Sequence, residues 1–206
     1  MKFYSRIFSH FYDPVMGSFE QHVLSERRKF LLQDITPPVL EIGAGTGANL
    51  FYYPFFNKDF RLTIIEKNPF MVEKIKQKFP EISSRIDFIV DSIENQSLIN
   101  HLPKFNSIVS TLTLCSVNDL GLTISHIKQL LEKQGIFYLI EHIRSKKNFY
   151  GTFQDIISPG WKLIGDGCHI NRNTDVVLKQ AFTPIYEEYF FSGIDFYLAK
   201  MKLPKN

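Results

Sequence analysis

The chain is poor in cysteine, and its charges nearly balance. Its 206 residues include two cysteines, Cys115 and Cys168, and carry a formal net charge of +3. Two cysteines cannot build a disulfide framework, and no Cys/His spacing suggests zinc, so we expect no metal. Because no dense basic tract is interleaved with aromatic residues, nucleic acid is not an expected partner. A chain of this length forms one domain with an ample hydrophobic core.

Long hydrophobic runs are also missing. No segment reaches the ~20 apolar residues of a membrane-spanning helix. Lys2 and Arg6 interrupt the N-terminal stretch, which lacks the apolar region and cleavage site of a secretory signal. We therefore expect a soluble, cytoplasmic protein that is a monomer or weak dimer, and contact with a membrane surface stays open.

What is present is a regular alternation of apolar runs and helix-like segments. Helices are expected at about 48–56, 68–78, 98–102 and 121–131, and strands at 39–42, 62–66, 86–90, 107–111 and 136–140. This alternation predicts an α/β fold with a doubly wound, mostly parallel sheet. Two β-rich runs joined by Ser192-Gly193, at 185–191 and 195–201, predict an antiparallel hairpin that completes a seven-stranded sheet.

The first 35 residues are helical in spacing and rich in aromatic side chains. One helix is expected before Asp13-Pro14 and a second from about Met16 to Asp34, in which Arg27-Arg28-Lys29 is interpreted as a solvated face. We expect residues 1–35 to form a helical lid on a main domain of residues 36–206. Ordinary packing of an amphipathic helix on the sheet is the alternative. The lid residues expected to line an apolar acceptor pocket are Tyr4, Phe8, Phe11 and Tyr12.

The most informative stretch is residues 39–47, Val-Leu-Glu-Ile-Gly-Ala-Gly-Thr-Gly. Glycine permits the sharp turn and a close ligand approach, so a Gly-rich turn between a strand and a helix is a common cofactor seat. The spacing is G-x-G-x-G, one residue shorter than the dinucleotide pattern. Glu66 and Asp91 end the next two apolar runs. Because strand ends face the ligand crevice, Glu66 is placed to bind two ribose hydroxyls and Asp91 an adenine amino group.

At these residues the chain resembles the class I S-adenosylmethionine (SAM)-dependent methyltransferases, whose sheet also has an antiparallel last strand. The resemblance implies SAM as cofactor and S-adenosylhomocysteine as product. Glu41 would meet the amino-acid end of SAM, Glu66 the ribose and Asp91 the adenine. A dinucleotide-binding domain, or a turn without a ligand, is the alternative. The other cofactor-binding positions implied are Gly43, Ala44, Gly45, Gly47, Asn49, Lys67, Ser92, Ile93, Thr111 and Leu112.

A narrower similarity is to the alkyl-thiol S-methyltransferases of the methyltransferase-like group and their soluble bacterial relatives. It rests on Cys115-Ser116-Val117, Glu141-His142 and the segment 153–168, although we expect no long N-terminal hydrophobic anchor like the one in that group. It implies methyl transfer to a small apolar acceptor, with a thiol as first choice. Quinone and phospholipid methyltransferases are also similar at the cofactor motifs. A C- or N-methyltransferase and a non-catalytic SAM-binding protein are therefore the alternatives.

Polar residues after the fifth expected strand are the catalytic candidates. His142 can act as a base near neutral pH, with Glu141 orienting it or binding a cationic substrate, and Tyr12 is expected to face the methyl group. The alternative is that this polar pair caps the strand and holds a neighbouring loop. Cys115 is interpreted as a small buried residue rather than a reactive thiol. Substrate contacts outside the lid are expected from Trp161, Asp166 and Cys168.

Overall fold

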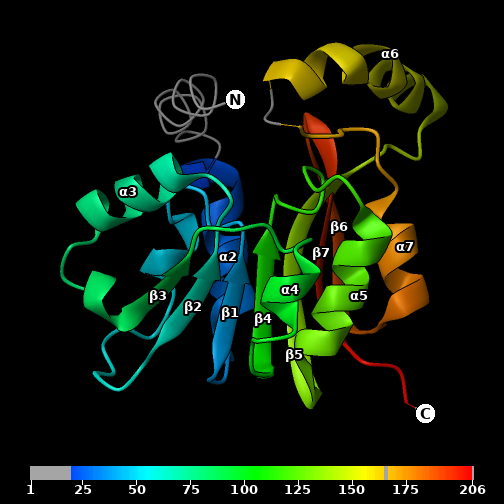
Figure 1. Ribbon diagram of the computed structural model, residues 1–206. Helices are drawn as coiled ribbons and strands as arrows, with labels where there is room; N and C mark the ends of the chain where they lie inside the picture. Colours follow the sequence, from blue (N-terminus) through cyan, green and yellow to red (C-terminus); the bar gives the residue numbers. More distant parts are fainter. Residues whose placement is uncertain (1–19, 165–166, 206) are drawn as a thin grey trace.

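The fold is built on a mixed sheet, which contains seven strands in the part of the chain that is described. The computed structural model describes residues 20–164 and 167–205. The strand order is β3-β2-β1-β4-β5-β7-β6, and β7 runs antiparallel to β5 and β6 (Figure 1). The doubly wound, seven-stranded sheet with an antiparallel last strand is therefore confirmed. The strands are β1 (Val39–Ile42), β2 (Leu62–Ile65), β3 (Ile86–Ile89), β4 (Phe105–Thr111), β5 (Leu131–Ile143), β6 (Thr183–Ser192) and β7 (Ile194–Lys202).

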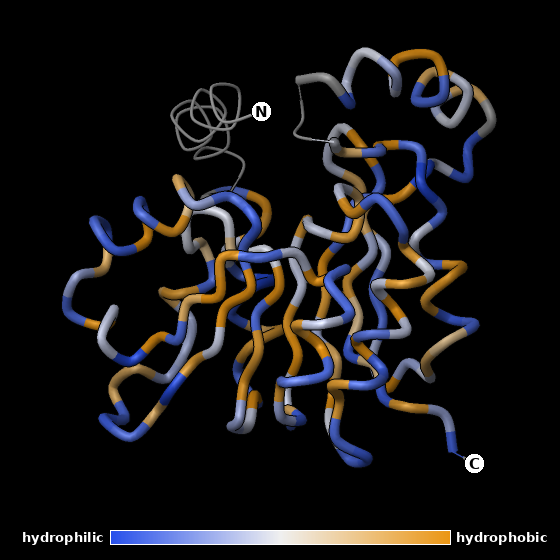
Figure 2. Tube along the Cα trace, in the orientation of Figure 1, coloured by the Kyte–Doolittle hydropathy of each residue, from blue (hydrophilic) through white to orange (hydrophobic). Residues whose placement is uncertain are grey.

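Helices cover both faces of the sheet. One buried cluster joins the sheet to α2 and α3, and the other joins it to α4, α5 and α7. Hydrophobic residues follow the strands through the middle of the molecule, as Figure 2 shows. The helical elements are η1 (Glu20–Leu24, a π-helical turn), α2 (Ser25–Leu32), the 3₁₀ turns η2 (Ala48–Phe51) and η3 (Ser83–Arg85), α3 (Pro69–Lys78), α4 (Gln96–Ile99), α5 (Leu120–Leu130), α6 (Asn148–Ile164) and α7 (Thr174–Ala181).

Side-chain caps explain where three of these helices begin. The Asn68 side chain accepts a hydrogen bond from the Phe70 amide at 3.0 Å, and Pro69 occupies the first helical position of α3. Asn95 caps α4 and Asp119 caps α5 in the same way. Each cap satisfies an amide that has no partner within its own helix. The expected start of α3 at Asn68-Pro69 is confirmed, and α5 lies within one residue of its expected range.

The expected helix at about 48–56 is wrong, because the structure has only the 3₁₀ turn η2 there. Pro54 has no amide hydrogen to donate, and it disfavours helical geometry at the preceding Tyr53. Phe56 is 91% exposed and contributes no core contact that could stabilise a further turn. The expected helix from Met16 to Asp34 is present over its described part as η1 and α2.

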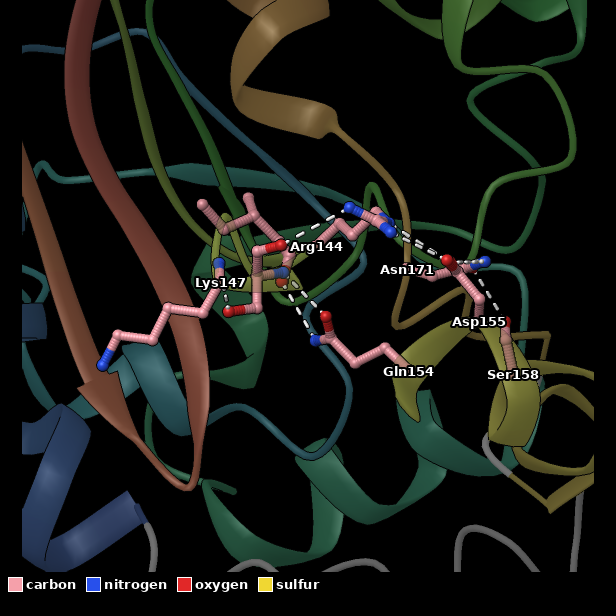
Figure 3. A network of polar contacts seen from close by, with 8 residues as sticks. Arg144, Lys147, Gln154, Asp155, Ser158 and Asn171 are labelled. Carbon is pink, nitrogen blue, oxygen red and sulfur yellow. Dashed lines mark hydrogen bonds and ion pairs between the residues drawn. The ribbon is translucent and has the colours of Figure 1, made fainter. Parts of the chain in front are cut away.

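Helix α6 lies above the carboxyl edge of the sheet, next to the β6–β7 hairpin (Figure 1). A polar network ties α6 to the chain after β5 and to the segment before α7 (Figure 3). Gln154 is buried, accepts from the Ser145 amide at 2.7 Å and donates to the Ile143 carbonyl at 3.2 Å. Asp155 pairs with Arg144 and accepts from Asn171. Among the helices described, none combines the length and apolar character needed to cross a membrane.

Candidate functional site

The glycine turn after β1 needs glycine for two different reasons. Gly43, Gly45 and Gly47 have φ angles of 67°, 56° and 84°, which side chains rarely tolerate. At Gly43 a Cβ atom would also collide with the Thr113 side chain, whose hydroxyl donates to the Gly43 carbonyl at 3.0 Å. At Gly45 a Cβ would meet no described atom within 4 Å. The turn is therefore packed against the β4 loop at Gly43 and open at Gly45, as a cradle for a ligand requires.

Glu66, at the end of β2, holds this turn together. One carboxylate oxygen accepts from the Gly45 amide at 3.0 Å, and the other accepts from the Asn68 amide at 2.9 Å. The side chain is only 6% exposed. A carboxylate accepts hydrogen bonds at about four lone-pair positions, so a carboxylate at this strand end is suited to accept from ligand hydroxyls. The exposed Lys67 follows it in the chain.

Glu41 lies in β1 inside a buried polar network. Its Oε1 accepts from Asn49 Nδ2 at 2.8 Å, and that amide also donates to Thr111 Oγ1 at 3.1 Å. Arg28 donates to both Asn49 Oδ1 and Thr111 Oγ1 at 2.6 Å. Of the positions expected to bind the cofactor, Asn49 thus contacts Glu41 directly, and Thr111 is joined to Glu41 through Asn49.

The interpretation of Arg28 as part of a solvated face is wrong, because only 3% of this residue is exposed. Arg28 shares one face of α2 with Leu31 and Leu32, and Leu24 at the end of η1 continues this face; all three leucines pack into the core. These positions recur at the three- and four-residue spacing of a helix face. That periodicity was available in the sequence and would have placed Arg28 inward.

Burial raises the pKa of Glu41 to about 7, against smaller opposing effects of Asn49, Tyr53 and Arg28. Its second oxygen, Oε2, has no hydrogen bond of normal geometry within the described residues. A buried carboxyl oxygen without a donor costs free energy that an incoming ammonium group would recover. The orphaned oxygen and the open Gly45 cradle both fit the amino-acid end of SAM.

The loop after β3 is already ordered by Asp91. Its carboxylate accepts from the Ser92 amide and from Asn95 Nδ2, both at 2.7 Å. Asp91 and Ser92 are half-buried, whereas Ile93 is 4% exposed and packs in the core against the face of β1 that carries Leu40 and Ile42. Ile93 therefore anchors this loop to the core.

The loop after β4 contains a strained residue. Leu112 has a φ angle of 56°, which is unusual for a bulky side chain, and its amide donates to the Ile140 carbonyl at 2.8 Å. Glu141 Oε1 accepts from the Thr113 and Leu114 amides at 3.0 and 2.9 Å and from the Ser110 hydroxyl at 3.2 Å. Backbone strain concentrates where surrounding contacts enforce it. Glu141 is such a contact, at the strand end where the cofactor seat opens.

Glu141 holds this loop and makes no hydrogen bond to His142 that the described residues reveal. The contacts of Glu141 therefore favour the alternative interpretation, in which this residue holds a neighbouring loop. Burial raises the pKa of Glu141 to about 8, and the Cys115 sulfur adds to this rise. Its Oε2 has no partner in residues 20–164 or 167–205.

His142 contacts sulfur. Its Nε2 lies 3.0 Å from Cys168 Sγ, and Cys115 completes a buried group of three. A hydrogen bond with Cys168 and the nearby His142 ring hold the pKa of Cys115 well below its usual range, although burial opposes this. Burial lowers the pKa of His142, but the Cys115 sulfur and Glu141 outweigh it, so the net direction is upward. Contact with Cys115, followed by burial, raises the pKa of Cys168.

The other predicted site residues lie on α6 or outside the described part of the chain. Trp161 lies on α6 with 43% of its surface exposed, and its side chain is in contact with Cys168. Exposed apolar side chains accompany it on α6, among them Phe149, Phe153 and Ile156. The remaining predicted residues lie outside the described part of the chain and are Tyr4, Phe8, Phe11, Tyr12 and Asp166.

The fold and site together define a SAM-dependent methyltransferase. A family model described as a methyltransferase domain matches residues 40–137, which run from β1 through the glycine turn and β4 into β5. The chain belongs to the class I SAM-dependent methyltransferases (EC 2.1.1) and is a distant homologue of the thiol S-methyltransferases.

Curated relatives extend the match beyond the family model. The thiol S-methyltransferase TMT1A of Homo sapiens is 29% identical over 179 residues, covering 84% of this chain and 71% of that protein. TMT1B of Rattus norvegicus is 31% identical over 140 residues, covering 66% of this chain and 55% of that protein. The mitochondrial methyltransferase OMS1 of Saccharomyces cerevisiae is 28% identical and is covered over 41% of its length. The chain thus spans little more than half of TMT1B and less than half of OMS1.

Solved structures agree on the fold. The N-methyltransferase NodS of Bradyrhizobium japonicum WM9, in complex with S-adenosylhomocysteine, superposes with a TM-score of 0.65 at 20% identity, covering 88% of this chain and 87% of that one. An O-methyltransferase family protein of Burkholderia thailandensis reaches a TM-score of 0.73 at 10% identity, covering 96% of this chain and 60% of that one. The match to the methyltransferase family, and not this likeness of fold, gives SAM as the cofactor and S-adenosylhomocysteine as its product.

Proposed function

We propose that the protein is a thiol S-methyltransferase that methylates a small apolar thiol. The observation that carries this proposal is the 179-residue similarity to a protein named as a thiol S-methyltransferase. A match of that length extends beyond residues 40–137, which are the residues matched by the methyltransferase-domain family model. The similarity to the thiol S-methyltransferase therefore includes segments that the general methyltransferase-domain model does not cover.

The site's own residues are suited to hold the cofactor in an extended pose. The ionised Glu41 would accept from the amino group, and the buried Arg28 guanidinium beside it would face the carboxylate. Glu66 would accept from the ribose hydroxyls and Asp91 from the adenine amino group. The open side of Gly45 leaves room for the chain between these ends. SAM supplies an electrophilic methyl group on a cationic sulfur.

A thiol acceptor also suits the groups beside this seat. A thiol has a pKa of about 8.5, so a few per cent is thiolate at neutral pH and little help from a protein base is needed. Glu141 is engaged with the β4 loop, and His142 is in contact with Cys168. A carbon or alcohol acceptor would need a dedicated base more urgently. The exposed apolar residues of α6 favour an apolar acceptor over a charged one.

The proposal is tested by measuring S-adenosylhomocysteine formation with three acceptors: a small alkyl thiol, a quinol, and phosphatidylethanolamine vesicles. We expect turnover with the thiol and identification of its S-methyl product by mass spectrometry. Glu66→Ala is the control, because losing the ribose acceptor should weaken SAM binding tenfold or more, by about 1.4 kcal/mol. Turnover with the quinol or the lipid alone would overturn the thiol as the methyl acceptor. SAM binding without any turnover would indicate a non-catalytic protein.

A further inference from the structure

The second chemical feature of the molecule is the group of Cys115, His142 and Cys168, here termed the sulfur–imidazole cluster. Each member comes from a different segment: the loop after β4, the end of β5, and the chain between α6 and α7. One ligand atom from each lies within 4.8 Å of the other two, and His142 Nε2 is 3.0 Å from Cys168 Sγ. Three side chains that are common metal ligands thus converge on one point.

We propose that this cluster binds a zinc ion, with three protein ligands and one open coordination position. Zinc prefers sulfur and imidazole ligands in a tetrahedron, with bonds of roughly 2.0–2.3 Å, so its ligand atoms are roughly 3.5–4 Å apart. The observed group needs shifts of about 1 Å or less to reach that geometry. Two cysteines and one histidine are also a donor set found in catalytic zinc sites.

The surroundings hold the cluster in place without a metal. Arg172 Nη1 donates to the Leu114 and Val117 carbonyls at 2.7 and 2.9 Å, which fixes the loop that carries Cys115. The His169 amide donates to the Cys115 carbonyl at 2.8 Å, which joins the two cysteine-bearing segments. Contacts of this kind orient metal ligands and raise metal affinity.

The cluster is also mostly enclosed. Cys115, His142 and Cys168 are 2%, 7% and 8% exposed, and Ile157 and Ile170 pack against the two sulfurs. The other polar contacts of Cys115 Sγ are weak ones at 3.6 Å, with the Leu112 carbonyl and the Ser116 hydroxyl. An apolar shell limits solvent access to a bound metal. Trp161, which is in contact with Cys168, places the exposed part of α6 next to this shell.

The open position gives the metal a role in the reaction, and this part rests on the proposed thiol methylation. Cys115 follows Thr113 by two residues, and Thr113 contacts Gly43 in the cofactor seat. An acceptor thiol that displaces water from zinc binds as thiolate and releases its proton to solvent. Its sulfur then attacks the methyl carbon. The bond from that carbon to the sulfonium sulfur breaks, its electron pair stays on the departing S-adenosylhomocysteine, and the methylated product leaves zinc as a neutral thioether.

Zinc content of the whole protein is the first test. Protein purified with reductant, loaded with Zn²⁺ and desalted should retain one zinc per chain by elemental analysis. Cys168→Ser and His142→Gln should each weaken zinc binding by at least about 100-fold. The matched control is His169→Gln, a neighbouring histidine outside the cluster, which should keep full zinc content. Wild-type protein without zinc, or variants that retain it equally, would overturn the site. Circular dichroism and S-adenosylhomocysteine binding verify that each variant is folded.

Cobalt spectroscopy tests the open position. Co²⁺ bound to the cluster should show thiolate charge-transfer absorption, and a small alkyl thiol should intensify it while the matching thioether leaves it unchanged. Bound cobalt that does not respond to thiol would overturn the open position, even if thiols are methylated. A thiol response without any thiol methylation would support the site and overturn the proposed function instead. Formation of a Cys115–Cys168 disulfide in place of metal binding, detected by mass spectrometry under reductant, would overturn the zinc proposal.

Discussion

At the scale of single residues, the site depends on polar groups that are buried before any ligand is bound. Glu41 is 1% exposed and has a raised pKa, and Arg28, which donates to two neighbours of Glu41, is 3% exposed. Burying a carboxylate costs free energy unless its lone pairs are satisfied. Glu41 therefore destabilises the free protein in its ionised form and is suited to bind a cation.

Glu41→Gln should have opposite effects on the stability of the protein and on its binding of SAM. The pKa of Glu41 in the folded protein, about 7, lies above the ordinary value of 4.5. Its contribution to the unfolding free energy is therefore fully present below pH 4.5 and is lost as the pH rises through 7. The variant should therefore gain up to about 3 kcal/mol in unfolding free energy relative to wild type between pH 5 and pH 8. Urea unfolding at both pH values measures this difference.

Binding of SAM should show the reverse pattern. At pH 8 the variant lacks the ionised acceptor for the amino group, so we expect at least a tenfold loss of affinity, or about 1.4 kcal/mol. Near pH 5.5 wild-type Glu41 is mostly protonated, and the two affinities should converge. Glu81→Gln, at an exposed position, is the control and should change neither quantity. Equal losses at both pH values in calorimetry would contradict the assignment of Glu41 to the amino group.

At the scale of secondary-structure elements, α6 is attached by two kinds of polar contact. Gln154 is 4% exposed and bridges backbone groups of Ser145 and Ile143. Asp155 is largely exposed and pairs with Arg144 (Figure 3). Exposed ion pairs contribute little, whereas an unsatisfied buried backbone group is costly. The buried amide, and not the ion pair, should therefore fix α6 over the carboxyl edge of the sheet.

We accordingly expect Gln154→Ala to lower the unfolding free energy by about 1–3 kcal/mol, because two backbone groups lose their partner. It should also speed amide exchange across α6. Asp155→Ala is the comparison and should have a much smaller effect on both. Urea unfolding and exchange monitored by mass spectrometry provide the readouts. A larger loss from Asp155→Ala would show that the exposed part of the network secures the helix.

At the scale of the whole molecule, the cofactor seat joins strand ends that lie far apart in the chain. Glu41, Glu66 and Thr111 come from three strands that are adjacent in the sheet. A ligand that contacts several strand ends binds the folded state only, so it stabilises the entire domain.

Thermal unfolding should detect this coupling. S-adenosylhomocysteine at 100 times its Kd should add about 2.7 kcal/mol and raise Tm by about 5–11 °C. Gly45→Ala and Gly193→Ala form a matched pair, because both glycines have positive φ and an added methyl group would meet no described atom within 4 Å at either position. Both should lower the basal Tm through backbone strain. Because we place only Gly45 next to the cofactor, Gly45→Ala should abolish the rise in Tm caused by S-adenosylhomocysteine, and Gly193→Ala should keep it. The same rise in Tm in both variants would contradict this placement.

Much of the fold was predictable because its signals are local. Strand and helix periodicity, the cap at Asn68-Pro69 and the hairpin at Ser192-Gly193 depend on neighbouring residues. The expected helix at 48–56 is reduced to the turn η2, and this also has a local cause, Pro54, which the prediction did not take into account. The spacing of Arg28 with the leucines of α2 is likewise local, but its polar partners are not.

The sequence by itself determined the order of the strands, the glycine turn and the acids at the strand ends, because each follows from the spacing of adjacent residues. Only the tertiary structure decided that Arg28 reaches Asn49 and Thr111, that Glu141 holds the β4 loop, and that Cys115, His142 and Cys168 converge. These contacts join segments that are distant along the chain. Their distances are set by the packing of α2, α6 and α7 around the sheet, which no local pattern specifies.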